Sequence, residues 1–143
     1  MKRISDIDPV LLAKIKQGTV IPAQVLALDE NRKFAPRYQR ALCRYFIDAG
    51  VGGIAVGVHS TQFAIRNPEI GLFEPVLRQT SEFIDQWCDF RGKKILKVAG
   101  VCGKTEQALY EAEFAVKAGY DAGLLSMAAF ANDNPNIFFI CGH

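Results

Sequence analysis

The stretch Ala49-Gly50-Val51-Gly52-Gly53-Ile54-Ala55-Val56-Gly57-Val58 decides the fold class. Apolar residues recur along residues 42–49 at the spacing of one helical face, and Gly50 is a residue type that ends helices. Ile54 to Val58 follows as a short apolar run without alternation, which is typical of a strand buried on both faces of a parallel sheet. The stretch therefore predicts a helix that leads directly into a buried strand.

The same pattern returns at Ala118-Gly119-Tyr120-Asp121-Ala122. Around the two stretches the sequence predicts further strands, from Thr19 to Leu28, from Ile95 to Ala99 and from Ala122 to Ala129. It also predicts a helix capped by Asp8 and ended by Gly18, a helix from Pro36, a helix from Pro75 to Gly92 and a helix over 105–118. The inward residues are expected to be Leu11, Leu12 and Ile15 in the first of these helices, Val76, Leu77, Phe83, Ile84, Trp87 and Cys88 in the third, and Leu109, Ala112 and Val116 in the last. This alternation predicts an α/β protein with a parallel sheet and right-handed crossovers. It does not distinguish an open sheet from a closed barrel.

Residues 1–130 thus form one predicted domain, and residues 131–143 break its pattern. Residues 131–136 are loop-forming, and the apolar run from Ile137 to Cys141 has no helical period where an amphipathic helix is due. We interpret this tail as the product of a shifted reading frame or an early stop. A genuine short edge strand is the alternative.

Composition and charge exclude several function classes. Half of the 143 residues are hydrophobic, enough for a buried core, and 17 basic against 15 acidic residues give no concentrated positive charge for nucleic acid. Met1-Lys2-Arg3 is followed by acidic residues and not by an apolar stretch, so neither a signal peptide nor a membrane span is expected. We therefore expect a cytoplasmic protein without nucleic-acid or membrane partners.

Cysteine and histidine spacing does not predict a metal site. The cysteines show no paired spacing, and neither histidine lies at a ligand interval from a cysteine. These residues are Cys43, Cys88, Cys102, Cys141, His59 and His143. We expect reduced, mostly buried thiols.

Three stretches carry a family resemblance. The first, Tyr38 to Thr61, is a helix that leads through a "GxxGI" pattern into a strand ending in the loop Val58-His59-Ser60-Thr61-Gln62. The second, Lys97 to Thr105, is a strand followed by an "AGTG"-like turn. The third, Ala118 to Leu125, is similar to the "AGADAVL" pattern that leads into a strand. Together they resemble the dihydrodipicolinate synthase / N-acetylneuraminate lyase family over roughly residues 18–130. The resemblance implies a (β/α)₈ TIM barrel of ~250 residues, of which this chain holds about the first four strand–helix units after a short N-terminal helix.

The resemblance also implies a class I aldolase or lyase that needs no metal or organic cofactor. In that family a strand lysine forms a Schiff base with a 2-oxo acid such as pyruvate, and a loop hydroxyl pair meets the substrate carboxylate and completes a proton relay. The matching positions here are Ser60, for substrate binding, and Thr61, for binding and relay. Hydroxyl and backbone N–H groups at a strand's carboxyl end suit a carboxylate. The alternative is that Ser60 and Thr61 only cap a turn.

The loop departs from the family pattern at three positions. His59 and Gln62 replace two glycines, and Phe63 replaces a glutamate, so larger side chains change the pocket mouth and place a plain pyruvate substrate in doubt. Arg66 is a candidate for binding a second carboxylate, and His59 is a candidate proton-transfer group. A surface arginine and a simply hydrogen-bonded histidine are the alternatives.

The family's Schiff-base lysine and relay tyrosine have no matching positions, because no tyrosine follows Tyr120 and no lysine follows Lys117. Lys97 could replace the lysine only if it faced a barrel interior, where desolvation favours nucleophilic lysines. We therefore expect little or no lyase activity from a truncated chain, whose 2-oxo acid substrate belongs to its ancestral role.

Two alternatives come from other classes. The first is a non-catalytic half-barrel that self-associates, as a homo-oligomer or an aggregate, through its open sheet edges. The second, less favoured, is a phosphate-binding module built on Ala99 to Thr105, although Val98 stands where the G-x-x-x-x-G-K-[ST] motif needs its first glycine.

Overall fold

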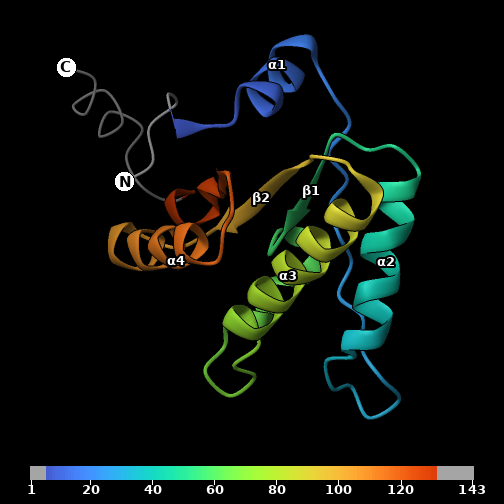
Figure 1. Cartoon of the computed structure of the whole chain (residues 1–143). Helices are drawn as coiled ribbons and strands as arrows, with labels where there is room; N and C mark the ends of the chain where they lie inside the picture. The colour runs from blue at the N-terminus through green and yellow to red at the C-terminus, as the bar shows by residue number, and fades with distance from the viewer. Residues whose placement is uncertain (1–5, 132–143) are drawn as a thin grey trace, which may run out of the picture.

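The computed structural model describes residues 6–131, along which helices and strands alternate (Figure 1). The elements are α1 Pro9–Gln17, α2 Pro36–Asp48, β1 Gly53–Val56, the short 3₁₀ helices η2 His59–Thr61 and η3 Phe63–Arg66, α3 Phe73–Arg91, β2 Leu96–Val101, α4 Thr105–Lys117, β3 Ala122–Leu125 and the 3₁₀ helix η4 Met127–Phe130. Nearly all of the tail that was predicted to be atypical, including Cys141 and His143, falls outside the described residues.

The three strands form one parallel sheet in the order β1-β2-β3. Gly53 lies opposite Leu96 at the start of the β1–β2 pair, and Val98 lies opposite Ala122 at the start of the β2–β3 pair. Sequential parallel strands joined by α3 and α4 confirm the predicted α/β class. The sheet and its helices are consistent with part of a TIM barrel.

The strand predicted from Thr19 to Leu28 is instead an extended segment along β1, with a single bridge from Ala23 to Ala55. Its backbone hydrogen bonds to the β1 region are Gly52 N–H to Val20 O (3.0 Å), Ala55 N–H to Pro22 O (2.9 Å) and Gln24 N–H to Ala55 O (2.8 Å). Pro22 has no N–H to donate, so the ladder is interrupted there. The four predicted strands are therefore three strands and one irregular segment.

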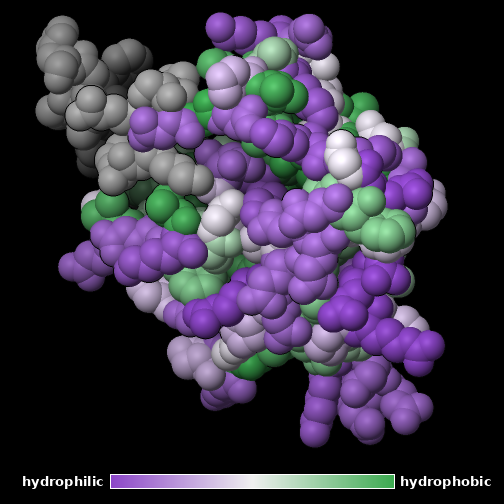
Figure 2. Space-filling model, viewed as in Figure 1, coloured by the Kyte–Doolittle hydropathy of each residue, from purple (hydrophilic) through white to green (hydrophobic). Residues whose placement is uncertain are grey.

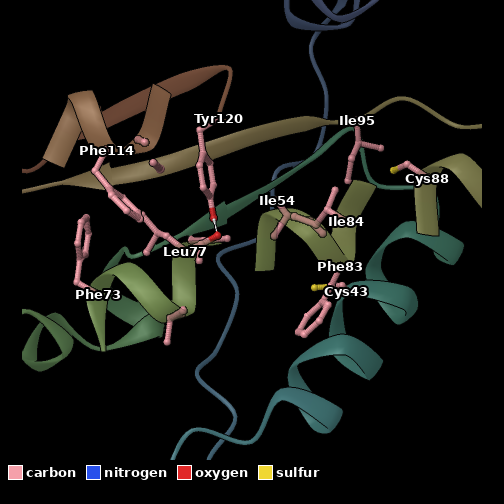
Figure 3. Packing of buried hydrophobic residues seen from close by; sticks show 14 of the residues in the cluster. Cys43, Ile54, Phe73, Leu77, Phe83, Ile84, Cys88, Ile95, Phe114 and Tyr120 are labelled. Carbon is pink, nitrogen blue, oxygen red and sulfur yellow. Dashed lines mark hydrogen bonds between the residues drawn. The ribbon is translucent and has the colours of Figure 1, made fainter. Parts of the chain in front are cut away.

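Helices α2 and α3 pack against each other and against the sheet, and they enclose the main core (Figure 1). Figure 3 shows side chains from both helices and from the strand side converging in this core. The Tyr120 hydroxyl donates to the Leu77 carbonyl oxygen (2.9 Å), which satisfies a buried polar group, and burial raises the pKa of Tyr120 well above its usual range. The α3 residues predicted to face inward are buried, except Trp87, which is half-buried.

Helix α1 begins and ends as predicted. The Asp8 carboxylate accepts from the Val10 N–H (2.8 Å), Pro9 occupies the first turn, and Gly18 ends the helix. A hydrogen bond from Lys94 to the same carboxylate holds the pKa of Asp8 below its usual range. The predicted apolar side is corrected in part, because of its three residues only Leu11 is buried.

The predicted inward face of α4 is wrong. Glu111, Phe114 and Ala115 are its buried residues, whereas Leu109 is 60% exposed and Val116 is also exposed. Apolar residues occur on two sides of this helix, and only one of those sides meets the core. Local periodicity cannot tell which side that is.

The open side of α4 borders β3, which is the least buried strand. Leu109 of α4 and Leu125 of β3 line a hollow of about 370 Å³ there, and Leu124 is 57% exposed. Figure 2 shows hydrophobic surface near α4. Strand β3 also ends at Leu125, short of the predicted Ala129, because the chain turns into η4, whose cap is the Ser126 side chain.

Within residues 6–131, the structure contains no helix that is both long enough and apolar enough to span a membrane.

Candidate functional site

The carboxyl ends of β1 and β2 lie side by side and carry two loops, residues 57–72 and residues 102–104. Ligands of parallel α/β proteins bind at this edge. The first loop begins against the backbone of β2, since a Cβ added to Gly100 of β2 would lie 2.4 Å from the Gly57 carbonyl oxygen. The structure places all four predicted site residues in the first loop: His59, Ser60, Thr61 and Arg66.

Thr61 is fully buried, and its hydroxyl fixes the loop after β1. The hydroxyl donates to the Gln24 carbonyl oxygen (2.7 Å) and accepts from the Gly57 N–H (3.0 Å). These bonds tie η2 both to the extended segment beside β1 and to the turn that follows the strand. The Thr61 hydroxyl has one hydrogen and donates it to Gln24, so a proton relay through Thr61 requires this hydrogen bond to break. The relay role stays a prediction.

Ser60 and His59 lie nearer to solvent than Thr61. Ser60 is half-buried, and its hydroxyl has no hydrogen-bond partner within residues 6–131. His59 is exposed and meets the Phe63 ring edge-on, with 5.8 Å between the ring centroids. Phe63 therefore supports the histidine ring. Substrate binding by Ser60 and proton transfer by His59 stay predictions.

Arg66 is buried against Glu111 of α4, with 9% of its side chain and 2% of the Glu111 side chain exposed. Arg66 Nε donates to both Glu111 oxygens (2.9 and 3.1 Å), and Nη2 donates to the Gly100 carbonyl oxygen (3.0 Å). Glu111 also accepts from Gln107 Nε2 (2.8 Å) and from the Cys102 N–H (2.9 Å). This network joins the first loop, the end of β2 and helix α4.

The environment of Arg66 favours a structural role. Its guanidinium lies 4.8 Å from the Phe73 ring centroid, and Glu111 compensates its charge. The adjoining hollow of about 670 Å³ is lined by Arg66 together with Glu74 and Glu111, so its acidic groups outnumber its one basic group. Glu111 and Gly100 occupy Nε and Nη2, whereas Nη1 is buried without a hydrogen-bond partner within residues 6–131. Binding of a substrate carboxylate by Arg66 stays a prediction.

Lys97 does not face a barrel interior. Its Nζ donates to both Asp85 carboxylate oxygens (2.6 and 2.7 Å) and to Ser81 Oγ (3.0 Å), which belong to α3. Residues two apart share a face of a strand, and Ala99 packs in the core that α3 covers. The hypothesis that Lys97 replaces the Schiff-base lysine is therefore wrong.

The loop after β2 has an acidic neighbour where a phosphate would need donors. The Cys102 N–H donates to the Glu111 carboxylate, which would also repel a phosphate. This geometry argues against the phosphate-binding alternative.

Glu111 is the residue that sequence reasoning missed. It lies three and four residues before Phe114 and Ala115, so the helical period places it on the buried side of α4. A buried carboxylate calls for a partner, and that requirement was the available signal.

The described cysteines are free thiols, and burial raises the pKa of Cys43 to about 11. No cluster of three or more His, Cys, Asp or Glu residues that could hold a metal ion occurs within residues 6–131.

No protein-family model and no curated protein matches the sequence, but solved structures match the fold. Dihydrodipicolinate synthase from Bacillus clausii superimposes with a TM-score of 0.66 at 19% identity, over 83% of this chain and 36% of that chain. The synthase from Aquifex aeolicus gives 0.58 at 20% identity, over 75% and 33%. CdNal from Clostridium difficile, solved with mannosamine, gives 0.52 at 19% identity, over 75% and 34%.

These elements match part of the dihydrodipicolinate synthase fold. The resemblance read from the sequence is thereby confirmed at the level of the fold. The chain spans about a third of the length of the synthases it matches, 33% to 36%. At such low identity the likeness establishes the fold alone, because one fold supports many activities.

Proposed function

We propose that this chain provides the first strands of a cytoplasmic barrel lyase that acts on a 2-oxo acid. In this proposal the loop after β1 receives the substrate carboxylate. The supporting observation is the anchoring of that loop by Thr61, which holds the half-buried Ser60 at the carboxyl end of the sheet. Ser60 then contacts the substrate carboxylate. Thr61 holds Ser60 in position, and it relays protons once the Thr61 hydroxyl is released from Gln24.

We further propose that this chain by itself forms no imine with a 2-oxo acid. Lys97, which lies within β2, is engaged by Asp85 on the α3 side. Lys104, in the loop after β2, is exposed to water, and the desolvation that favours a nucleophilic amine is absent there.

Reductive trapping tests the second proposal. The chain is incubated with pyruvate and borohydride, and its intact mass is measured. We expect no adduct, and a covalent adduct at any lysine would overturn this proposal.

Nuclear magnetic resonance tests the first proposal. In a titration with pyruvate, we expect amide shifts at His59 and Ser60 that the Ser60→Ala variant loses. The matched control, Ser126→Ala, removes a hydroxyl at the carboxyl end of β3 and should keep them. Shifts that persist in Ser60→Ala, or no shifts in the wild type, would contradict carboxylate binding by this loop.

A second candidate function is a non-catalytic half-barrel that associates through its sheet edge. The observation that favours it is the exposure of Leu124 and Leu125 on β3, beside the apolar side of α4. Such an edge invites pairing with another chain. Loss of association in Leu124→Lys would support this candidate.

A further inference from the structure

The exposed face of helix α2 consists mainly of arginine and tyrosine. After Pro36, its exposed residues are Arg37, Tyr38, Arg40, Ala41, Arg44, Tyr45 and Asp48. The helix contains neither lysine nor glutamate, which are common on solvated surfaces. Arginine and aromatic residues are enriched at protein interfaces, whereas lysine and glutamate are depleted there. The composition of this face is therefore that of a binding surface.

Three residues of this face form an arginine stripe, defined as Arg37, Arg40 and Arg44. The spacing of three and four residues places them on one side of the helix. The only carboxylate of α2, Asp48, is engaged by Arg91 (2.8 Å) and by the Trp87 indole N–H (3.0 Å). Within residues 6–131, no carboxylate lies within ion-pair distance of the stripe. This part of the chain therefore leaves the charge of the stripe uncompensated.

Two arginines of the stripe are held by aromatic rings of α3. The Arg40 guanidinium lies 4.6 Å from the Phe83 ring centroid, and that of Arg44 lies 4.4 Å from the Trp87 centroid. A guanidinium stacked on a ring can still bind a carboxylate through two N–H groups at its edge. Because these side chains are already ordered, binding an anion costs less side-chain entropy.

Two hollows share Arg40 and Arg44 as lining residues. The first, of about 490 Å³, is completed by Arg37 and by Ala41, whose small side chain leaves room between the arginines. The second, of about 310 Å³, lies between α2 and α3, which pack side by side (Figure 1). We call the second the aromatic hollow; its other lining residues are Phe83, Gln86, Trp87 and Phe90. A carboxylate bound to the stripe would thus lie beside an apolar recess.

Exposed aromatic side chains lie on both sides of the stripe. In the aromatic hollow the Trp87 and Phe90 rings stack with 4.9 Å between their centroids, and Phe90 is largely exposed. Tyr38 and Tyr45 of α2 are more than half exposed. Each tyrosine directly follows an arginine of the stripe, so it lies about 100° further round the helix. Tryptophan, tyrosine and arginine are the residue types that contribute most of the binding energy at protein interfaces.

These features fit an acidic peptide segment better than a nucleic acid. The stripe spans about 10 Å, because an α-helix rises ~1.5 Å per residue. Asp48 follows the stripe on the same side of α2 and would repel a longer row of phosphates. The chain as a whole has a net charge of only +2. A short segment with one carboxylate for each arginine and one large apolar side chain would match both the stripe and the aromatic hollow.

We propose that the exposed face of α2 binds an acidic peptide segment of another protein. The carboxylates of the segment pair with the arginine stripe, and its apolar side chain enters the aromatic hollow. The proposal does not depend on lyase activity. The ion pairs lie at the surface, so the complex weakens as salt screens them.

Isothermal titration calorimetry of the full chain with three probes tests this proposal. The probes are a random copolymer of glutamate and tyrosine, polyglutamate, and oligothymidylate of similar charge. We expect the copolymer to bind most tightly, with a dissociation constant that rises at least about tenfold between about 0.05 and about 0.5 M salt. Polyglutamate lacks a side chain for the aromatic hollow and should bind at least about fivefold more weakly.

Variants of the stripe and of the hollow separate charge from geometry. Arg40→Gln/Arg44→Gln should weaken copolymer binding at least about tenfold. Arg40→Lys/Arg44→Lys keeps the charge but loses the planar fork, so we expect a loss of at least about threefold. Phe90→Ser should lower the affinity for the copolymer to that for polyglutamate. Arg37→Gln, which lies outside the aromatic stacking, replaces the double variants if those lose their circular dichroism spectrum.

Two controls match these variants. Lys16→Gln/Lys33→Gln removes the same charge at exposed positions on α1 and in the loop before α2, and it should bind the copolymer as the wild type does. Leu109→Ser removes an exposed apolar side chain from α4 and should also bind normally.

Several results would overturn the proposal. These are no binding of the copolymer at low salt, equal binding by the wild type and the arginine variants, and an equal loss in the lysine control. Tighter binding of oligothymidylate than of the copolymer would overturn it in favour of a nucleic acid.

Discussion

The α2–α3 side of the molecule and the α4–β3 edge contain similar residues but differ in burial. On the first side, Ile54 and Leu77 are fully excluded from water. At the edge, Leu109 and Leu124 remain more than half exposed. The difference shows that apolar content does not by itself make a core. A buried strand needs backbone on both of its edges as well as a covering helix. Within residues 6–131, β1 lies between the extended segment around Ala23 and β2, and β2 lies between β1 and β3, whereas β3 is paired on one edge only.

The largest expected effect concerns Glu111, which joins α4 to Arg66 in the loop after β1 and to the end of β2. Glu111→Gln removes the charge that compensates the buried Arg66, so we expect the free energy of unfolding to fall by about 3–5 kcal/mol. Urea denaturation measures this fall. The matched control is Glu113→Gln, exposed on the same helix, with an expected change within about 0.5 kcal/mol. Equal effects in the two variants would show that the network contributes no stability.

A pair of leucine substitutions tests the comparison directly. Leu77→Ala leaves a cavity in the core and should lower the free energy of unfolding by about 2–5 kcal/mol. Leu124→Ala at the exposed edge should change it by less than about 0.5 kcal/mol. A large loss in Leu124→Ala, measured by the same denaturation, would mean that the edge is covered in solution.

The smallest expected effect is a difference in reactivity between the thiols of Cys43 and Cys102. Burial raises the pKa of Cys43 from 9.0 to about 11, so about one in a thousand of its thiols is ionised at pH 8. The stability gained from keeping this thiol protonated is complete below pH 9.0 and is lost as the pH rises through about 11.

Iodoacetamide labelling at pH 8, followed by mass spectrometry, measures this difference. Cys102, whose pKa burial also raises, lies half-buried in a loop, and we expect it to react first. Cys43 should react only on unfolding. Equal labelling rates in the folded protein would contradict the burial of Cys43.

Local chemistry allowed much of the fold to be predicted. The Asp8 cap, the helix from Pro36 and the strand after Gly53 depend on neighbours in the chain, and the structure confirms them. The side of a helix that meets the core depends on the whole arrangement, and so α4 was assigned the wrong face. Pro22 was the overlooked local signal against a regular strand at residues 19–28.

The candidate site was predictable in position but not in its contacts. The first loop lies at the carboxyl end of the sheet, where the resemblance placed it. Arg66 and its partner Glu111 are 45 residues apart, and Thr61 binds Gln24 across 37 residues. No periodic pattern links such pairs. Lys97 shows the same limit, because strand alternation gives two faces without saying which one a helix covers.

The position of Trp87 gives the molecule an optical reporter of its own. It is the only tryptophan of the chain, and its ring lies between α2 and α3, stacked on Phe90 and bonded to Asp48. Its emission therefore follows the separation of these two helices and does not register fraying of β3. Comparing that emission with circular dichroism during one denaturant titration would reveal, without any label, whether the two sides of the molecule melt together.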